Sequence, residues 1–321
     1  MSAAELARLD RLADRLIRAR CAVPAQALTM EFDCTPARLL AMIEMLDALG
    51  APVAEAADGY TLELRDPLDA EAIRAGLPQV QAATVVVRRV CVSTNEVTRT
   101  LEPPSVCVAE AQTAGRGRRG TQWKQPFGAG LALSVVAPVP RGRLDPLAIA
   151  LALTAADCLE SLGYLGIRLK WPNDLYAREA KLGGLMVELE GAAPGRLCLG
   201  LGLNVWSAPS VAEHRTIALA ELGGSPPDRN RLAAALAGAF TVALRRYDAA
   251  GFSPFAAEFP ARDWLAGHTV RLHDRAEVVT GLARGIDDSG ALILDTDAGL
   301  RRCRSGEVSR VSREEEAWAN A

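Results

Sequence analysis

The stretch GRGRRG, residues 115–120, places three arginines on a glycine-rich loop. It follows an apolar run at 106–109 that we interpret as a strand. Glycines let a backbone fold closely around a ligand, and guanidinium groups bind carboxylate and phosphate oxygens. Two shorter motifs further along the chain, KWPND at 170–174 and KLGG at 181–184, each place a lysine beside a predicted turn. The three motifs together predict a pocket that holds a carboxylate and a polyphosphate.

Lysine is rare in this chain, which makes its positions informative. The 321 residues contain 36 Lys plus Arg, but only Lys124, Lys170 and Lys181 are lysines. An ammonium group is a compact point charge that a planar guanidinium does not replace at a reacting oxygen. We therefore interpret Lys181 as a functional residue, with chance placement as the alternative interpretation.

The composition is that of an ordinary globular protein, with 50% hydrophobic and 23% charged residues. A formal net charge of −3 gives no overall attraction to nucleic acid or to an anionic membrane. The apolar runs are shorter than the roughly 20 residues of a membrane span. Residues 1–20 lack the pattern of a signal peptide. Seven cysteines without CxxC pairs, and three histidines without ligand spacing, argue against zinc. We predict a cytoplasmic protein of two or three domains.

Residues 1–65 predict a winged helix-turn-helix domain. Leucines at helical spacing form a first helix, a second helix fits 24–31, and Thr35 begins a third that stops at Gly50. The Asp-Gly pair at 58–59 is a favourable two-residue hairpin turn. Such domains usually bind DNA, yet this one has seven arginines, no lysine and ten acidic residues. Because little positive charge is available to neutralise phosphates, we expect weak or absent DNA binding.

The rest of the chain divides into three parts. Residues 66–80 read as a linker with a short helix, and 81–265 alternate strand-like runs with two clear helices. From 267 to 321, short alternating strands are separated by turn sequences, which suggests a small β-barrel. The sequence therefore predicts an α+β protein with a helical N-terminal domain, a larger central domain and a C-terminal barrel.

The 115–120 stretch also matches the GxGxxG pattern of dinucleotide-binding folds, but its context does not. Pro126 and Gly128 stand where a helix should begin, and no acidic residue follows at the ribose position. The stretch does not end in the Gly-Lys-Ser/Thr of a P-loop either. An RNA-binding patch would need more cations than three arginines.

Several polar residues support two interpretations each. The word STN at 93–95 follows one predicted strand and Gln112 ends the next. These residues are helix caps or ligands of a small polar heterocycle. Trp123 is either a core residue or a stacking platform for a base. Asp174 closes a turn and is equally suited to binding Mg²⁺ or orienting a lysine. The glycines of LGLGLN at 199–204 mark a strand that another group approaches closely.

The chain resembles biotin–protein ligases in a set of motifs that occur in the same order. They are STN, Gln112, GRGRRG, KWPND, KLGG and GLGLN. The resemblance covers about residues 85–205. The order of the flanking domains is similar to that of the bifunctional bacterial type, which also represses the biotin operon. The resemblance implies a central mixed-sheet biotin/lipoate ligase domain, class II synthetase-like, followed by an SH3-like barrel.

The resemblance also implies an activity. Biotin and ATP give biotinyl-5′-AMP and pyrophosphate, and biotin is then transferred to a lysine of the biotin carboxyl carrier protein of acetyl-CoA carboxylase. ATP and Mg²⁺ are the implied cofactors, no membrane partner is implied, and a homodimer is implied in the adenylate-bound state. The implied biotin-binding residues are Ser93, Thr94, Asn95, Gln112, Gly115, Arg116, Gly117, Arg118 and Lys181. The implied ATP- or adenylate-binding residues are Arg118, Arg119, Trp123, Lys170, Asn173 and Asn204. The implied catalytic residues are Lys181, Arg118 and Asp174, and Asp174 is also the implied Mg²⁺ ligand.

Two features depart from the family pattern. The predicted recognition helix has one cation, Arg38, against Glu44 and Asp47, which disfavours operator binding. Arg310 lies one position from where a nucleotide-facing arginine is expected, so its role stays open. A lipoate–protein ligase, and a transcription regulator that senses biotinyl-AMP without transferring biotin, are the alternatives.

Overall fold

The computed structural model describes residues 1–19, 21–78, 84–191, 195–212, 214–224, 226–274 and 277–311. The chain forms two compact units. One consists of Met1–Val139 with Leu182–Gly238, and the other of Pro140–Lys181 with Ala239–Ala321. The ends of the predicted linker and of the predicted C-terminal domain, at 79–80 and 312–321, lie outside the described residues. Within the described ranges, every helix is too short or too polar to cross a lipid bilayer.

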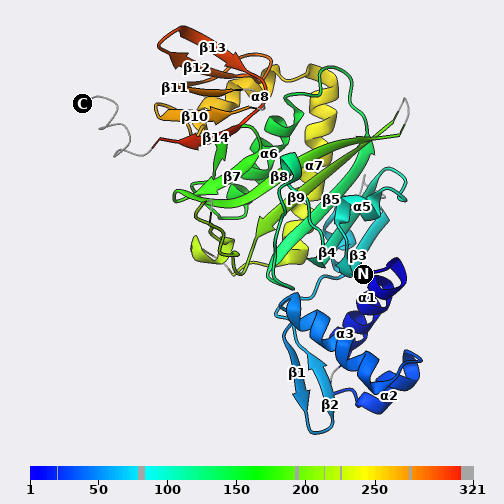
Figure 1. The fold of residues 1–321 in the computed structure, drawn as a ribbon. Helices are drawn as coiled ribbons and strands as arrows, with labels where there is room; N and C mark the ends of the chain where they lie inside the picture. The colour runs from blue at the N-terminus through cyan, green and yellow to red at the C-terminus, as the bar shows by residue number, and fades with distance from the viewer. Residues whose placement is uncertain are drawn as a thin grey trace. The chain divides into compact units, whose positions relative to one another are not determined.

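The first unit begins with three helices and a hairpin, drawn in blue in Figure 1. The helices are α1 (Ala3–Arg18), α2 (Ala25–Glu31) and α3 (Pro36–Ala48), and the strands are β1 (Val53–Ala56) and β2 (Gly59–Leu62). Ser2 and Glu5 form a capping box at the start of α1, and Thr35 caps α3 by accepting the Arg38 N–H. This order of three helices and a hairpin is as predicted and is compatible with a winged helix-turn-helix.

Five strands form the central sheet of the first unit. They are β3 (Thr84–Cys91), β4 (Ser105–Gln112), β5 (Gly130–Pro138), β8 (Ala180–Glu190) and β9 (Arg196–Asn204), in the spatial order β3-β4-β5-β9-β8. β3 and β4 are parallel, and the other neighbours in this order are antiparallel. The predicted mixed sheet is therefore confirmed. Helices α4 (Ala70–Gly76) and α5 (Thr94–Thr98) flank β3 in the chain, and the 3₁₀ turn η2 (Leu219–Glu221) follows β9.

The core of the N-terminal helices continues into this sheet. Buried leucines of α1 and α3 pack in one cluster with Val90, Ala111 and Phe127. Asp10 on α1 also accepts hydrogen bonds from the backbone N–H groups of Arg89 (2.6 Å) and Val90 (3.0 Å) on β3. An edge strand otherwise leaves such groups unpaired. Helix α1 therefore pairs with backbone groups of the edge strand β3, in addition to packing within the N-terminal domain.

The second unit carries the remaining helices and a short hairpin. Its helices are α6 (Leu147–Ser161), α8 (Ser253–Glu258) and the 3₁₀ turn η3 (Phe259–Ala261), while α7 (Arg229–Ala250) begins in the first unit and ends here. The hairpin strands are β6 (Arg168–Lys170) and β7 (Asp174–Ala177), with Lys170 opposite Asp174. β7 was not predicted from the sequence, because it is only four residues long and lies between two turns.

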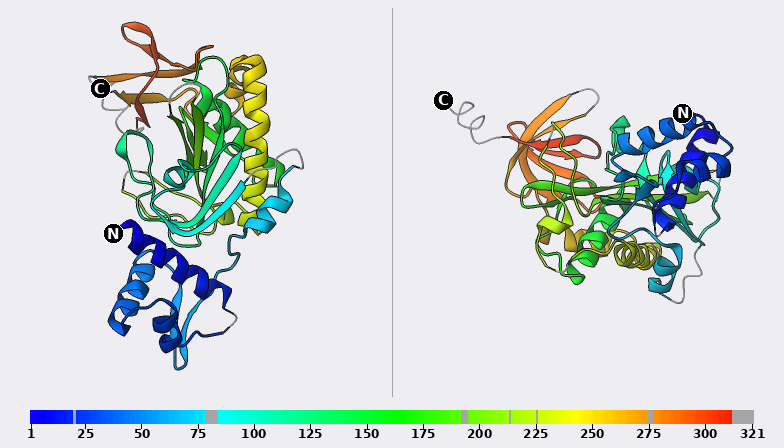
Figure 2. Two further views of the ribbon diagram at one scale, coloured as in Figure 1. Left: turned by 90° about the vertical axis from the view of Figure 1, so that its right-hand side faces the viewer. Right: turned by 90° about the horizontal axis from the view of Figure 1, so that it is seen from below.

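Five antiparallel strands form the C-terminal sheet of the second unit, drawn in orange and red in Figures 1 and 2. They are β10 (Thr269–His273), β11 (Val278–Ile286), β12 (Leu292–Thr296), β13 (Gly299–Cys303) and β14 (Glu307–Arg310), in the order β13-β12-β11-β10-β14. The predicted SH3-like barrel is corrected to an open sheet: among residues 267–274 and 277–311, the edge strands β13 and β14 do not pair. Alternating residues and turns predict the strands but not the closure.

Candidate active site

The glycine- and arginine-rich loop folds back on itself in the first unit. The Trp123 N–H donates to the Gly115 oxygen (2.9 Å), and the Gly117 N–H donates to the Thr121 oxygen (2.7 Å). A Cβ on Gly115 would lie 2.5 Å from the Trp123 oxygen, and a Cβ on Gly117 would lie 2.4 Å from Thr121 Oγ1. These contacts are too short for any side chain. A side chain at position 115 would meet backbone, and one at position 117 would displace the Thr121 hydroxyl, so glycine at both positions lets the loop close.

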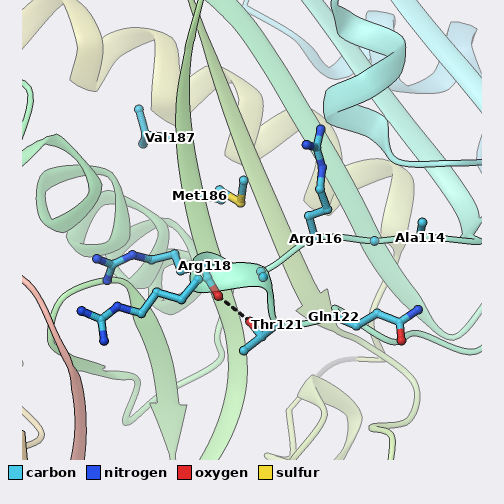
Figure 3. Close-up of a pocket in the computed structure, with 11 residues that line it drawn as sticks. Ala114, Arg116, Arg118, Thr121, Gln122, Met186 and Val187 are labelled. Atoms are coloured by element: carbon cyan, nitrogen blue, oxygen red, sulfur yellow. Dashed lines mark hydrogen bonds between the residues drawn. The ribbon is translucent and has the colours of Figure 1, made fainter. Parts of the chain in front are cut away.

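This loop lines a pocket of about 630 Å³, a size that suits a small-molecule ligand (Figure 3). Residues 114–122 contribute most of the lining, and Met186 and Val187 of β8 contribute the rest. In Figure 3, Arg116 and Arg118 point in different directions from the loop. Sequence analysis missed the two β8 residues, because apolar side chains in a strand carry no chemical signal.

A cluster of polar side chains joins the start of α5 to β4 and β5. Gln112 Oε1 accepts hydrogen bonds from the Thr94 backbone N–H (2.7 Å) and hydroxyl (3.3 Å). Ser134 Oγ lies 2.7 Å from Thr94 Oγ1 and 2.6 Å from Asn95 Oδ1. Ser93 is buried at the N-cap of α5 and makes no side-chain capping bond. The structure thus brings the predicted residues together and adds Ser134, which sequence analysis missed.

Two glycines of β9 make room for two of the predicted site residues. A Cβ on Gly200 would lie 2.5 Å from Asn95 Oδ1, and a Cβ on Gly202 would lie 2.3 Å from Trp123 Cε2. The close approach predicted for this strand is therefore made by side chains of the protein itself. Trp123 Nε1 donates to Gln125 Oε1 at 3.4 Å. Stacking of Trp123 on a base stays a prediction.

The three arginines of the loop have different surroundings. Arg116 forms ion pairs with Glu96 on α5 (3.3 Å) and with Glu188 on β8 (3.8 Å). Arg118 begins the 3₁₀ turn η1 (Arg118–Gly120), and Arg119 within it has a φ of 55°. That left-handed conformation is uncommon for a residue with a side chain. The loop backbone therefore directs each arginine separately.

Lys181 forms an ion pair with Asp174 in the second unit. The Nζ–Oδ2 distance is 2.9 Å, and the side chains are 19% and 21% exposed. Asp174 begins β7 and Lys181 is the second residue of β8, across a turn in which Arg178 and Glu179 have positive φ angles. The carboxylate holds the lysine in place, which is one of the two roles predicted for Asp174.

Lys170 is half-buried beside Tyr176. Its Nζ lies 3.4 Å from the Tyr176 hydroxyl and 5.4 Å from the centre of that ring. Burial lowers the pKa of Lys170 below its ordinary value, and nearby Asp174 acts in the opposite direction. A buried ammonium gains stability when an anion arrives. Contact of Lys170 with a phosphate stays a prediction.

Asp174 is the carboxylate that the resemblance implies as a Mg²⁺ ligand. Among the residues that the structure describes, no group of three or more His, Cys, Asp or Glu side chains is arranged to hold a metal ion. Mg²⁺ in nucleotide-dependent enzymes is bound by one or two carboxylates together with phosphate oxygens and water. Asp174 fits that mode, in which ATP brings most of the ligands.

Arg310 belongs to a different contact. Its guanidinium lies 3.3 Å from the centre of the Trp264 ring and 2.5 Å from Glu179. Burial lowers the pKa of Arg310, and the Glu179 charge opposes this shift. Arg310 thus joins β14 to the turn between β7 and β8. This contact accounts for the residue whose role the sequence left open.

The predicted residues fall in both units. Those of the first unit are Ser93, Thr94, Asn95, Gln112, Gly115, Arg116, Gly117, Arg118, Arg119, Trp123 and Asn204, and those of the second are Lys170, Asn173, Asp174 and Lys181. Asn173 and Asn204 are buried, and Asn204 Nδ2 donates to the backbone oxygen of Ile217 at 3.1 Å. Their contact with a nucleotide stays a prediction.

Comparison with known proteins adds a second line of observation. Residues 87–204 match the biotin/lipoate A/B protein ligase family, and residues 266–311 match the biotin protein ligase C terminal domain. The bifunctional ligase/repressor BirA of Escherichia coli is 34% identical over 267 residues, which cover 80% of this chain and 82% of that protein. A biotin--[acetyl-CoA-carboxylase] ligase of Mycobacterium tuberculosis is 36% identical over 210 residues, covering 63% and 77% of the two chains. The structure of Aquifex aeolicus biotin protein ligase with biotin and ATP gives a TM-score of 0.64 at 25% identity, covering 71% of this chain and 99% of that one.

Proposed function

Because this chain belongs to the biotin protein ligase family, we propose that it activates biotin with ATP and transfers it to a carrier protein. In the first step the biotin carboxylate attacks the α-phosphate of ATP, which gives biotinyl-5′-AMP and pyrophosphate. In the second step a lysine of the biotin carboxyl carrier protein of acetyl-CoA carboxylase attacks the mixed anhydride and AMP leaves.

The observation that carries this proposal is the polar cluster together with the arginine loop. Thr94, Asn95 and Gln112 hold neutral donors and acceptors in fixed positions, which suits the ureido group of biotin. The loop that follows supplies Arg118 and Arg119 for the carboxylate and the phosphate. Neutral hydrogen-bonding groups combined with cations fit a polar heterocycle that carries an acid.

Lys181 has the central role in the first step. Attack of a carboxylate on a phosphate joins two anions, so a cation at the reacting oxygens lowers the barrier. Asp174 positions the Lys181 ammonium at 2.9 Å. Lys170 would bind the triphosphate, and Mg²⁺ held by Asp174 and the phosphates would neutralise part of the triphosphate charge. Trp123, Asn173 and Asn204 complete the nucleotide contacts.

Transfer to a purified carrier domain tests the proposal. Full-length protein, biotin and ATP are expected to add the mass of one biotinyl group to one lysine of the carrier domain. A carrier in which that lysine is arginine is the control and should stay unmodified. A preference for lipoate over biotin would support the lipoate ligase alternative. Release of pyrophosphate without transfer would support the adenylate-sensing regulator.

The N-terminal domain is expected to bind DNA weakly or not at all at physiological salt. Arg38, the single cation of α3, is paired with Glu5 at 2.6 Å, and this hydrogen bond lowers the pKa of Glu5 to about 2. Glu44 and Asp47 add negative charge to the same helix. Non-specific DNA affinity comes mainly from neutralising phosphates, and α3 offers them little.

Fluorescence anisotropy with labelled DNA from upstream of biotin-synthesis genes measures this binding. The titration is run with and without biotin plus ATP, and a shuffled duplex is the control. Nanomolar binding to the operator fragment alone would establish a repressor.

We also propose a homodimer in the adenylate-bound state. Sedimentation velocity tests it, and a monomer mass with biotin and ATP present would contradict it.

A further inference from the structure

We propose that Glu188 is a positioning residue for biotin, because its single carboxylate orients Asn95 and anchors Arg116. This inference rests on the proposed function of the polar cluster and names a residue outside the predicted site. Glu188 lies near the end of β8, and its side chain is 22% exposed. One carboxylate oxygen faces α5 and the other faces the arginine loop, so Glu188 connects three elements around the site.

The first contact decides which way the Asn95 amide points. Asn95 Nδ2 donates to Glu188 Oε2 at 2.6 Å, and Asn95 Oδ1 lies 2.6 Å from Ser134 Oγ. A carboxylate only accepts hydrogen bonds, so it fixes the NH₂ end of the amide toward itself and the oxygen toward Ser134. Asn95 is only 6% exposed and lies against Gly200, where even a Cβ would collide with it. Its orientation is therefore set by Glu188 rather than by solvent.

The second contact anchors the loop. The Arg116 guanidinium lies 3.8 Å from Glu188 and 3.3 Å from Glu96, and Arg116 points away from Arg118 in Figure 3. The backbone of Arg116 also pairs with Gln122 across the loop. Holding Arg116 therefore holds the closed hairpin of the loop near Asn95. The bond to Asn95 is part-buried and 2.6 Å long, whereas the Arg116 pair is more exposed and 3.8 Å long, so the contact with Asn95 is the stronger of the two effects.

The two contacts predict which substrate is affected. The polar cluster binds the head of biotin, while the proposed triphosphate contacts come from Lys170 and Asp174. Loss of the Glu188 charge should therefore weaken the binding of biotin and leave the KM for ATP unchanged. Glutamine at position 188 keeps the size of the side chain. It presents either an oxygen or an NH₂ group to Asn95, so the amide is no longer held in one orientation.

Calorimetric titration of biotin into the full-length protein, without ATP, tests the proposal. Glu188→Gln is expected to raise the Kd for biotin about tenfold, the usual size of one lost charged hydrogen bond, with the KM for ATP unchanged. Glu190→Gln is the matched control. It lies two residues further along β8 and pairs with Arg99 (3.3 Å) and Arg196 (3.6 Å), so biotin affinity should stay at the wild-type value.

A double-variant cycle separates positioning from general damage. If Glu188 acts through Asn95, Glu188→Gln should add little further loss in an Asn95→Ala background. An unchanged biotin Kd in Glu188→Gln overturns the proposal, and so does an ATP KM that rises in parallel or an equal loss in Glu190→Gln. Failure of the wild-type protein to bind biotin would instead overturn the proposed function itself.

Discussion

Replacing Lys181 by alanine is expected to slow biotinyl-AMP formation by roughly 10²–10³-fold, the loss seen when one group that stabilises transition-state charge is removed. Lys181→Arg is expected to recover little of this loss. The ammonium is a compact charge whose Nζ lies 2.9 Å from Asp174. A guanidinium is broader and pairs with a carboxylate through two parallel bonds, which places its charge elsewhere.

Pyrophosphate release at saturating biotin and ATP measures this prediction, because it reports the first step alone. Lys124→Ala is the control, since Lys124 is an exposed lysine outside the proposed site and should retain wild-type rates. Thermal midpoints of all three variants separate catalysis from stability. A Lys181→Arg variant that releases pyrophosphate at a near-normal rate would show that position 181 needs a positive charge but not a lysine.

The parts of the site that the sequence predicted are those with unusual local chemistry. Arginines between glycines at 115–120 and the STN word at 93–95 stand out against their neighbours. Ser134 and Glu188 do not stand out, because each is an ordinary residue within a strand. They reach the site through sheet register, which sets Glu188 opposite Cys198 and Ser134 opposite Gly200. Contacts between residues so distant in the chain leave no trace in the spacing of a motif.

The fold shows the same division between local and distant information. The Thr35 cap predicted the start of α3 correctly, and the Asp58-Gly59 pair predicted the hairpin, because such signals act within a few residues. The turn itself lies one residue earlier than predicted, at Ala57 and Asp58, because Gly59 already pairs with Ala56 as the first residue of β2. The expected barrel at the C-terminus depends on pairing between the two edge strands, β13 and β14. Alternating hydrophobicity does not encode that pairing. The attachment of α1 to β3 through Asp10 was likewise absent from the sequence analysis.

A buried ion pair in the first unit is expected to have the largest effect on stability. The side chains of Glu110 and Arg229 are 0% exposed, and Arg229 Nη1 lies 2.6 Å from Glu110 Oε2. Asp66 binds Arg229 at 2.8 Å, and Arg89 binds Glu110 at 3.1 Å. Removing the Glu110 charge takes away the one fully buried carboxylate and leaves Arg229 and Arg89 with the partly exposed Asp66 and Asp14 alone.

Glu110→Gln is expected to lower the free energy of unfolding by about 3–5 kcal/mol, because both arginines then face a neutral amide of the same shape. Urea unfolding of the full chain, followed by tryptophan fluorescence, gives the change. Glu31→Gln is the control. Its pair with Arg15 is 3.1 Å long but 45% and 39% exposed, so its loss should cost at most about 1 kcal/mol. Equal changes in the two variants would contradict the prediction.

The unfolding of the N-terminal domain is expected to be coupled to that of the central sheet. Arg89 binds Glu110 and also Asp14 on α1 (2.9 Å), while its backbone N–H donates to Asp10. A continuous series of ion pairs therefore links the start of α7 to β4, β3 and α1. Residues 1–65 should consequently unfold together with the central sheet, in the wild type and in Glu110→Gln alike. A separate, earlier transition of the N-terminal domain would show that these contacts do not couple it to the sheet. A domain released in that way would be free to act on its own.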